Sequence, residues 1–349
     1  MPPLRIAVCT SQVPFDFGGA EMLAGALIRE LEKRGHETAL IQLPLRCFPK
    51  EEILKSYLMW RLTNLDHTYD MRPIHRVIAL KFPAYAISHP HKTTWLIHQL
   101  RQAYDLYDTE YSFFDNTPED HELRGMISHM DRVTINESER IYSISANVAH
   151  RLRKYNRVHS QVLYPPPPLD GRFYHDHYGD YVLCVSRLHH VKRVDPLIHA
   201  LRHTRTPVRC IIAGRGPDME RLQKLAARNK VADRVDFLGF VPDEEVIDLY
   251  ARALAVYYAP VDEDYGFATI EGMKSRKPIL TLDDSGGVLE FVKQGVTGLI
   301  AAAGAPELLA ECMDTLYENR DMAKRLGSAG QEIVAPITWD STIERLLDA

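Results

Sequence analysis

Three adjacent carboxylates, at 262 to 264, follow an apolar segment in the second half of the sequence. The apolar segment, 253 to 259, is predicted to be a buried parallel strand. After Gly266 the chain enters a predicted helix at 267 to 274, which places Glu271 in its first turns. Backbone N–H groups at a helix start are available to anions and hydroxyl oxygens. This stretch therefore predicts a site for a ligand rich in hydroxyl and phosphate groups.

Cationic side chains follow another predicted strand, at 181 to 185. Arg187 and Lys192 lie in the loop between this strand and a predicted helix at 196 to 201. Ligands of parallel α/β sheets bind at the carboxyl ends of the strands. Two cations in such a loop are therefore placed to hold an anionic ligand.

A glycine turn, Gly214-Arg-Gly216-Pro, joins the next predicted strand, 209 to 213, to a helix at 218 to 229. It is not the dinucleotide-binding fingerprint, because the third glycine and the acidic residue about twenty positions later are missing. The turn is therefore no evidence for a nicotinamide or flavin cofactor.

The first half of the chain contains two similar candidates. Gly18 and Gly19 lie between a predicted strand at 4 to 9 and a helix at 21 to 34, an arrangement that aims backbone N–H groups at a phosphate. A tight structural turn would explain the same glycines. His98 follows a predicted strand at 93 to 97, where ligand crevices form, although a structural histidine also fits.

The elements that position these residues form two α/β halves. A chain of 349 residues exceeds one typical core and suits two domains. Strands alternate with helices in both halves, which predicts parallel sheets. Four consecutive prolines, 165 to 168, cannot continue a sheet and mark the boundary. We expect domains at 1 to 168 and 178 to 335.

Composition excludes several other classes of protein. The formal charge of −5 argues against nucleic acid as the main partner. The five cysteines are far apart and form no CxxC pair, so we expect reduced thiols without zinc. The sequence has no apolar run of membrane-spanning length and opens on a strand without a signal-peptide pattern, which favours a cytoplasmic location. The fragment His175-Asp-His177 lacks a third metal ligand nearby.

Segment 45 to 65 alternates basic side chains with large apolar ones. Such a helix can lie on an anionic membrane or dock a lipid-linked substrate. It can equally pack on its own sheet with a solvated basic face. A peripheral contact with the inner face of a membrane is therefore one of two interpretations.

Taken together, the motifs resemble those of the retaining glycosyltransferases of family 4, which have the GT-B fold of two facing Rossmann-like domains. The segment from Glu263 to Glu271 resembles the family's Glu-x7-Glu signature, and Arg187 with Lys192 resembles its Arg-x4-Lys pair. Gly214 to Pro217 is similar to its GxGP turn, and Gly18-Gly19 to the glycine pair of its first loop. The resemblance extends over most of the chain but only in outline over 45 to 130. The sequence departs from the family pattern at Asp264 and Phe267.

The resemblance implies a nucleotide diphosphate sugar donor, with uridine or guanosine as the base, and a glycan or lipid-linked acceptor. It implies no metal ion and no cofactor. Glu271 would bind the ribose and Glu263 the sugar, while His98 would lie beside the sugar. The catalytic residues implied are His98, Glu263, Arg187 and Lys192. The donor-binding residues implied are Gly18, Gly19, Arg187, Lys192, Gly214, Gly216, Phe240, Val241, Glu263, Gly266, Phe267, Ala268 and Glu271.

In the family the last helix, here 338 to 349, crosses back onto the first domain, which carries the acceptor. Two alternatives stay open at the level of sequence. One is another enzyme on the same fold, such as a nucleotide-sugar epimerase or a phosphorylase. The other is a sugar-nucleotide binding protein without catalytic activity, although the intact pair Glu263 and Glu271 argues against that.

Overall fold

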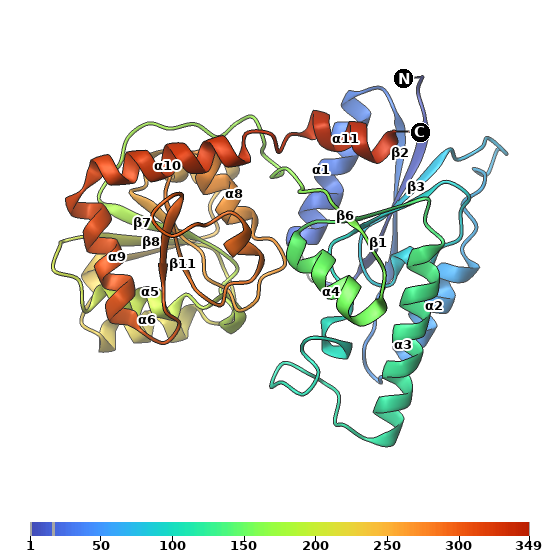
Figure 1. Cartoon of the computed structure of the whole chain (residues 1–349), viewed down its shortest axis with the longest axis horizontal. Coiled ribbons are helices and arrows are strands. Elements are labelled where there is room, and N and C mark those ends of the chain that lie inside the picture. The colour runs from blue at the N-terminus through green and yellow to red at the C-terminus, as the bar shows by residue number, and fades with distance from the viewer. Residues whose placement is uncertain (1, 16–17, 349) are drawn as a thin grey trace. The chain divides into compact units, whose positions relative to one another are not determined.

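The computed structural model describes residues 2–15 and 18–348, and the chain divides into two compact units. Unit 1 comprises residues 1–168 and 339–349, and unit 2 comprises residues 169–338. Within the described residues, each unit contains one six-stranded sheet in which every strand pair is parallel. Helices cover both faces of each sheet (Figure 1). Each unit therefore has the layered α/β architecture that the alternating elements predict.

Unit 1 has the strand order β2-β1-β3-β4-β5-β6. The strand order reverses between β1 and β3, and open α/β sheets bind ligands at the carboxyl ends of the strands at such a point. The elements of unit 1 are β1 (Arg5–Gln12), α1 (Gly19–Lys33), β2 (Glu37–Pro44), α2 (Glu52–Leu62), β3 (Arg76–Ala79), β4 (Lys92–Leu96), α3 (Pro118–Asn136), β5 (Arg140–Ser143), α4 (Ala146–Asn156), β6 (Gln161–Val162) and α11 (Trp339–Leu347).

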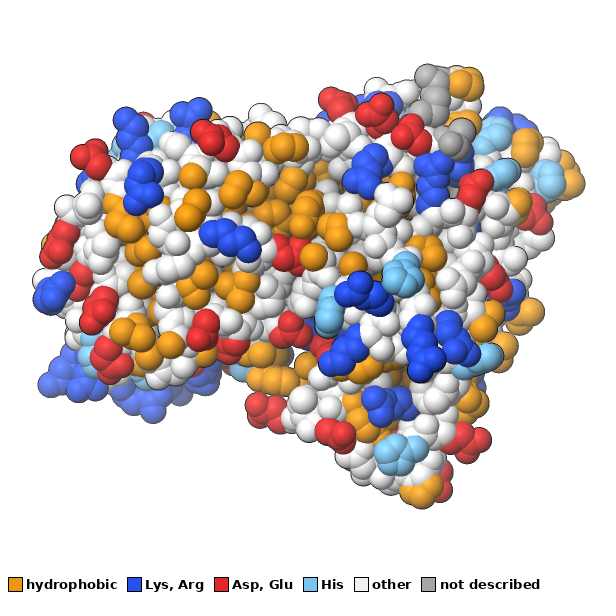
Figure 2. Space-filling model, viewed as in Figure 1, with side chains coloured by type: hydrophobic (Ala, Val, Ile, Leu, Met, Phe, Trp, Pro, Cys, Tyr) orange, Lys and Arg blue, Asp and Glu red, His pale blue; other side chains and the backbone are white. Residues whose placement is uncertain are grey.

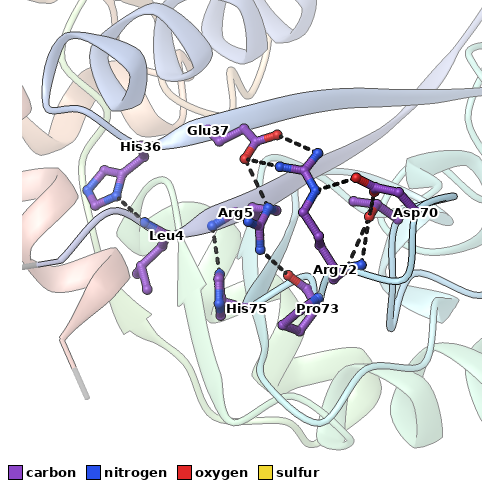
Figure 3. Close-up of polar contacts among 9 residues, drawn as sticks. Leu4, Arg5, His36, Glu37, Asp70, Arg72, Pro73 and His75 are labelled. Atoms are coloured by element: carbon purple, nitrogen blue, oxygen red, sulfur yellow. Dashed lines mark hydrogen bonds and ion pairs between the residues drawn. The ribbon is translucent and has the colours of Figure 1, made fainter.

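A polar cluster lies at the amino ends of β1 and β2, opposite the carboxyl ends of these strands (Figure 3). The Arg5 guanidinium and Glu37 form an ion pair of 2.9 Å, and Arg72 contacts Glu37 and Asp70 in turn. The Arg5 backbone N–H donates to the imidazole of His75 at 2.8 Å. These residues hold the amino ends of the strands together, so their role is structural.

Helix α2 lies in the segment whose pattern allowed two interpretations. Ile53, Tyr57 and Trp60 are buried, so one face of the helix packs on its own unit. Leu58 and Leu62 are 59% and 82% exposed, so a second apolar face meets solvent. The packing interpretation is therefore confirmed for one face, and the exposed face leaves the membrane interpretation as a prediction.

Helix α11 belongs to unit 1 although it follows unit 2 in the sequence. The Tyr142 hydroxyl donates to the carbonyl of Arg345 at 3.0 Å, and the Trp339 indole donates to the carbonyl of Pro167 at 3.3 Å. Trp339, Ile343 and Leu346 are buried. The return of the last helix to the first unit, which the family resemblance implies, is thus present in the structure.

Unit 2 has the strand order β12-β11-β10-β7-β8-β9, so its order reverses between β7 and β10. Apolar side chains of α5, α6 and α9, including Leu197, Leu222 and Met313, pack with the strands in one core. The elements are β7 (Tyr181–Val185), α5 (Asp195–Leu201), β8 (Arg209–Ala213), α6 (Met219–Arg228), β9 (Val235–Gly239), α7 (Asp243–Arg252), β10 (Ala255–Tyr257), α8 (Phe267–Lys274), β11 (Ile279–Leu282), β12 (Gly298–Ala301), α9 (Pro306–Glu318) and α10 (Arg320–Val334).

The structure differs from the sequence-based expectations at three places. The sequence predicts a helix that starts at Leu289-Glu290, whereas the structure has only a short 3-10 turn there, Gly287–Glu290. The strand β12 that follows was not predicted, because four residues without alternating polarity carry little signal. The apolar run at 253 to 259 is a strand only over Ala255–Tyr257, and its remainder forms the entry and exit of the strand.

No helix of the described residues is long and apolar enough to cross a membrane.

Candidate functional site

The cations and carboxylates predicted for the second half follow the two strands at which the sheet order of unit 2 reverses. Arg187 and Lys192 follow β7, while Glu263 and Gly266 follow β10. Strands β7 and β10 are direct neighbours in the sheet. Two loops that are about 70 residues apart in sequence are therefore brought together at the ligand-binding edge of a parallel sheet.

Lys192 and Glu263 form an ion pair in this position. The Lys192 Nζ lies 2.5 Å from the Glu263 Oε2, and the two side chains are 21% and 17% exposed. The Tyr258 hydroxyl donates to the same carboxylate oxygen at 3.0 Å and accepts from Lys192 at 3.2 Å. Three polar groups from two loops thus hold one another at the edge of solvent.

The charge state of Lys192 is fixed by its carboxylate partner. Burial acts to lower the pKa of Lys192, but the adjacent Glu263 carboxylate outweighs it and raises the pKa well above its usual range. Burial also raises the pKa of the Tyr258 hydroxyl, so that it stays protonated and can donate. The site therefore presents a permanent cation beside a hydroxyl donor.

The loop that carries the carboxylates is tied to the loop after β11. The Arg193 guanidinium donates to the backbone carbonyls of Ala259 and Pro260 and to both oxygens of Asp284. The Gly287 N–H donates to the Glu263 carbonyl at 2.7 Å. A Cβ at Gly287 would lie 2.5 Å from the Asp264 carbonyl oxygen, so glycine is required for this approach. The carboxylate loop is therefore held from both sides.

Gly266 allows the turn that starts helix α8. Its φ is +88°, and a Cβ there would lie 2.8 Å from the ring of Tyr258. Phe267 and Ala268 are the first residues of α8, and the N–H groups of a first helical turn have no partner within their helix. These residues follow β10, which agrees with the predicted role of their N–H groups as hydrogen-bond donors to sugar or phosphate. That role itself stays a prediction.

Glu271 is held by a tyrosine from the preceding helix. The Tyr250 hydroxyl, from the last turns of α7, donates to the Glu271 Oε2 at 2.7 Å, and Tyr250 is completely buried. Burial raises the pKa of Glu271 to about 7, although the hydrogen bond from Tyr250 lowers it. Glu271 is thus a carboxyl group whose charge is poorly solvated until a ligand supplies hydrogen-bond donors.

The glycine turn after β8 is packed against the loop that carries Arg187. A Cβ at Gly214 would lie 1.8 Å from the Ser186 carbonyl oxygen, and a Cβ at Gly216 would lie 2.0 Å from that of Leu188. The Leu188 N–H donates to the Arg215 carbonyl at 2.9 Å. These glycines therefore set the path of the cationic loop. A direct contact with the donor base stays a prediction.

Phe240 and Val241 follow β9 on the same edge of the sheet. Phe240 is 65% exposed, and the Arg215 guanidinium lies 5.5 Å from its ring centroid. Val241 is 9% exposed. An exposed aromatic ring beside a cation is a suitable platform for a planar base.

In unit 1 the glycine pair lies at the start of α1. The Gly18 N–H donates to the Glu21 Oε2 at 2.9 Å, and the other Glu21 oxygen pairs with Lys81 at 2.6 Å. Burial acts to raise the pKa of Glu21, but the bonds from Lys81 outweigh it and lower the pKa. A phosphate that binds the Gly18 N–H must therefore displace the Glu21 carboxylate. Gly19 is the first residue of helix α1.

His98 follows β4, and its Nδ1 lies 2.8 Å from the Gln99 carbonyl oxygen. The side chain of Gln99 is completely buried and donates to Asn156, which in turn donates to the Tyr104 hydroxyl at 2.9 Å. His98 is half-buried at the carboxyl end of its strand. It therefore lies where the sequence places it, next to a rigid polar network.

The described residues contain no group of three or more His, Cys, Asp or Glu side chains that could hold a metal ion. The Nδ1 of His175 instead lies 2.9 Å from the Nζ of Lys277, which also donates to the carbonyl of His177. The absence of a metal from the reaction stays a prediction.

The predicted site residues thus fall into two sets. Gly18, Gly19 and His98 belong to unit 1, and the others belong to unit 2. The structure adds residues that the sequence argument missed. Tyr250 and Tyr258 hold the two glutamates, Arg193 with Asp284 fixes the loop, and Lys81 with Glu21 caps the first helix. All but Tyr258, which lies five residues from Glu263, are remote in sequence from their partners. Only the strand ends at which Tyr258 and Lys81 lie could have indicated them.

Comparisons with known proteins agree with this geometry. Residues 174–333 match the model of the family described as "Glycosyl transferases group 1". A mannosyltransferase of Mycobacterium tuberculosis, named as GDP-mannose-dependent alpha-(1-6)-phosphatidylinositol monomannoside mannosyltransferase, is 33% identical over 178 residues. That match covers 48% of this chain and 46% of the relative. The chain thus spans less than half the length of this curated relative.

Solved structures extend the likeness to the fold of the whole chain. Sucrose-phosphate synthase from Thermosynechococcus elongatus has a TM-score of 0.77 and 16% identity, with 98% of this chain and 97% of that chain covered. Anabaena HepE, solved in complex with UDP, has a TM-score of 0.71 and 16% identity, with 98% of each chain covered. These likenesses confirm the GT-B fold. The matched residues 174–333 carry the cationic loop, the glycine turn and both glutamates, so this part of the chain is similar to the group 1 glycosyl transferases.

Proposed function

We propose that the protein is a retaining glycosyltransferase that transfers a sugar from a nucleotide diphosphate sugar, with UDP or GDP as the nucleotide, to a glycan or lipid-linked acceptor. The observation that carries the proposal is the placement of Lys192 and Glu263 on neighbouring strand ends where the sheet order reverses. The match of residues 174–333 to the model of the group 1 glycosyl transferases supports the same class of reaction. The relative named as GDP-mannose-dependent supports a nucleotide-sugar donor.

The chemistry of the site agrees with this reaction. When the bond between the sugar and the diphosphate breaks, negative charge develops on the leaving phosphate. Pre-placed cations stabilise that charge more in the transition state than in the ground state. Arg187 is exposed on the loop after β7, and Lys192 stays protonated. We assign both to the diphosphate, so that no metal ion is needed.

The two glutamates divide the rest of the donor between them. Glu263, at the solvent edge, is assigned to the sugar hydroxyls, and Glu271, held by Tyr250, is assigned to the ribose hydroxyls. Retaining hydrolases use a free carboxylate as a nucleophile. The Glu263 carboxylate is instead paired with Lys192 and Tyr258, which favours attack by the acceptor from the face that the diphosphate leaves.

The product of transfer tests this mechanism. We expect transfer from an α-linked nucleotide sugar to yield an α-linked product, at a rate that excess EDTA does not change. The measurement is proton NMR of the anomeric signal of the product, with and without EDTA. A β-linked product would refute the retaining mechanism, and loss of turnover in EDTA that added Mg²⁺ restores would refute metal independence.

We further propose that unit 1 makes a peripheral contact with an anionic membrane through α2. Of its two exposed leucines, Leu58 lines an apolar groove of about 210 Å³, together with Arg61, Met130 and Val133 among others. Two buried leucines are worth roughly 3 kcal/mol, so we expect Leu58→Glu with Leu62→Glu to reduce binding to phosphatidylglycerol vesicles more than tenfold. Co-sedimentation measures this, and Leu308→Glu on α9 is the matched control. Equal sedimentation of all variants would contradict the contact.

A further inference from the structure

A second pocket lies in unit 1, and none of the residues assigned above lines it. It has a volume of about 250 Å³ and lies between the 3-10 turn Arg101–Ala103, α3 and α4. Its lining includes Tyr104, His121, Arg124, Ser128 and Tyr155. Drug-sized ligands occupy pockets of roughly 300 to 1,000 Å³, so this pocket suits a smaller group, such as part of a larger substrate.

Arg124 is held rigidly at this pocket without a carboxylate partner. Its Nε donates to the Ala103 carbonyl at 2.7 Å, and its guanidinium carbon lies 3.9 Å from the ring centroid of Tyr107. No ion pair joins Arg124 to an acidic side chain anywhere in residues 2–15 and 18–348. A stacked and oriented guanidinium retains two Nη groups for a ligand, in the fork geometry that matches phosphate oxygens.

The electrostatic surroundings favour an anion. The pocket lining contains an arginine and a histidine but no aspartate or glutamate. Lys154 Nζ lies 4.9 Å from the ring centroid of the lining residue Tyr155. Figure 2 shows Lys, Arg and His side chains gathered on the face over α3 and α4. Anions are concentrated at such a surface, and a bound anion gains most where it can displace water from a fixed cation.

A buried carboxyl group that contacts the lining residue Tyr104 does not cancel this charge. Asp131 is completely buried and accepts hydrogen bonds from the hydroxyls of Tyr57, Tyr85 and Tyr104. Burial raises the pKa of Asp131 well above its usual range, which favours its neutral form. The Tyr104 hydroxyl also accepts a hydrogen bond from Asn156, so the Tyr104 side chain in the pocket wall is held in place by two partners.

The remaining wall is aromatic. The rings of Tyr104 and Tyr155 lie with their centroids 5.6 Å apart, at an interplanar angle of 49°. Tyrosine rings offer an apolar face for the carbon skeleton of a polyol and a hydroxyl at the tip. The pocket thus combines a phosphate-binding guanidinium with a surface that suits a sugar or another polyol.

We propose that this pocket binds the phosphate group of a phosphorylated acceptor and that Arg124 is its principal ligand. The proposal rests on the proposed function in so far as it calls the occupant an acceptor. The binding chemistry itself is independent of transfer. The phosphate is either a monoester of a soluble sugar or polyol or the diester of a lipid headgroup, and both present oxygens to the guanidinium.

The test measures phosphate binding directly. Methyl phosphate represents the monoester and monomeric dihexanoyl phosphatidylglycerol the lipid diester, each titrated by calorimetry with and without saturating UDP or GDP. We expect Arg124→Gln to lower the affinity for the probe that the wild type binds more tightly by at least tenfold. Arg132→Gln, an exposed arginine two turns further along α3, is the matched control and should bind like the wild type.

A second variant guards against misfolding. Arg124→Lys keeps the charge but loses the fork geometry, so it should retain part of the affinity at an unchanged Tm. Equal affinity of wild type and Arg124→Gln, or no binding of either probe by the wild type, would overturn the proposal. Failure to bind any nucleoside diphosphate while the phosphate probe still binds would count against the proposed function instead.

Discussion

Replacement of Lys192 by methionine is expected to lower the turnover number of sugar transfer by about 10² to 10⁴. The methionine fills a similar volume but supplies no charge for the leaving diphosphate. It also leaves the Glu263 carboxylate without its cation at 2.5 Å, so that a negative charge would face the phosphate. The expected loss is therefore larger in turnover than in donor affinity. Single-turnover kinetics with saturating donor measure the chemical step separately.

Two further variants separate catalysis from stability. Lys192→Met with Glu263→Gln removes the uncompensated carboxylate, so it should recover most of the folding stability but not the turnover. Lys224 on α6 is the matched control, because its pair with Glu220 is fully at the surface and a change to methionine should have little effect. Wild-type turnover in Lys192→Met would contradict the role of this cation in transfer.

Replacement of Glu271 by glutamine is expected to weaken donor binding by about 10- to 100-fold while stabilising the empty protein at alkaline pH. We assign the carboxylate to the ribose hydroxyls, and a charged hydrogen bond is worth roughly 1.5 to 3 kcal/mol. Glutamine still accepts from the Tyr250 hydroxyl, so the local fold should persist. The measurement is calorimetric titration with the nucleotide diphosphate sugar.

The direction of the stability effect follows from the pKa of Glu271. Its folded-state pKa of about 7 lies above the ordinary value of 4.5, so the folded protein binds the proton more tightly than the unfolded chain. The stability associated with this proton is complete below pH 4.5 and is lost as the pH rises through 7. At pH 8 the glutamine variant should therefore be more stable by roughly 1 to 3 kcal/mol, whereas at pH 4 the two proteins should be equal.

Donor binding should also release a proton near neutral pH. The ribose hydroxyls favour the ionised form of Glu271, so the donor lowers its pKa and its affinity falls as the pH drops below 7. Titrations in buffers with different ionisation enthalpies measure this release. Identical affinity of Glu271→Gln and wild type, or a donor affinity that does not change between pH 6 and pH 8, would contradict the ribose assignment.

The sequence predicts the strand ends of the candidate site and the loops that follow them. The strand ends that carry Arg187, Lys192 and Glu263 follow from local apolar patterns, because buried parallel strands read as short apolar runs. Their convergence follows from the rule for ligand sites in open α/β sheets. The cationic loop and the carboxylate loop are therefore predictable from the sequence.

The partners that hold the site were not predictable in the same way. Tyr250 lies on α7 and reaches Glu271 across 21 residues of sequence, and Lys81 reaches Glu21 across 60. Such contacts depend on how helices pack on the sheet, which no local pattern encodes. The glycines of the turn after β8 show the same limit, because their closest neighbours are the Ser186 and Leu188 carbonyls of another loop.

The central claim is that the loops after β7 and β10 bind the diphosphate of a nucleotide donor. Calorimetric titration of wild type and of the double variant Arg187→Ala, Lys192→Ala with UDP, GDP, ADP and NAD tests it most directly. The account predicts that the wild type binds UDP or GDP at one site and that the double variant binds it about 10² to 10⁴ times more weakly. Two results would contradict it. One is that the wild type binds NAD but no nucleoside diphosphate, and the other is that the double variant binds UDP or GDP as tightly as the wild type does.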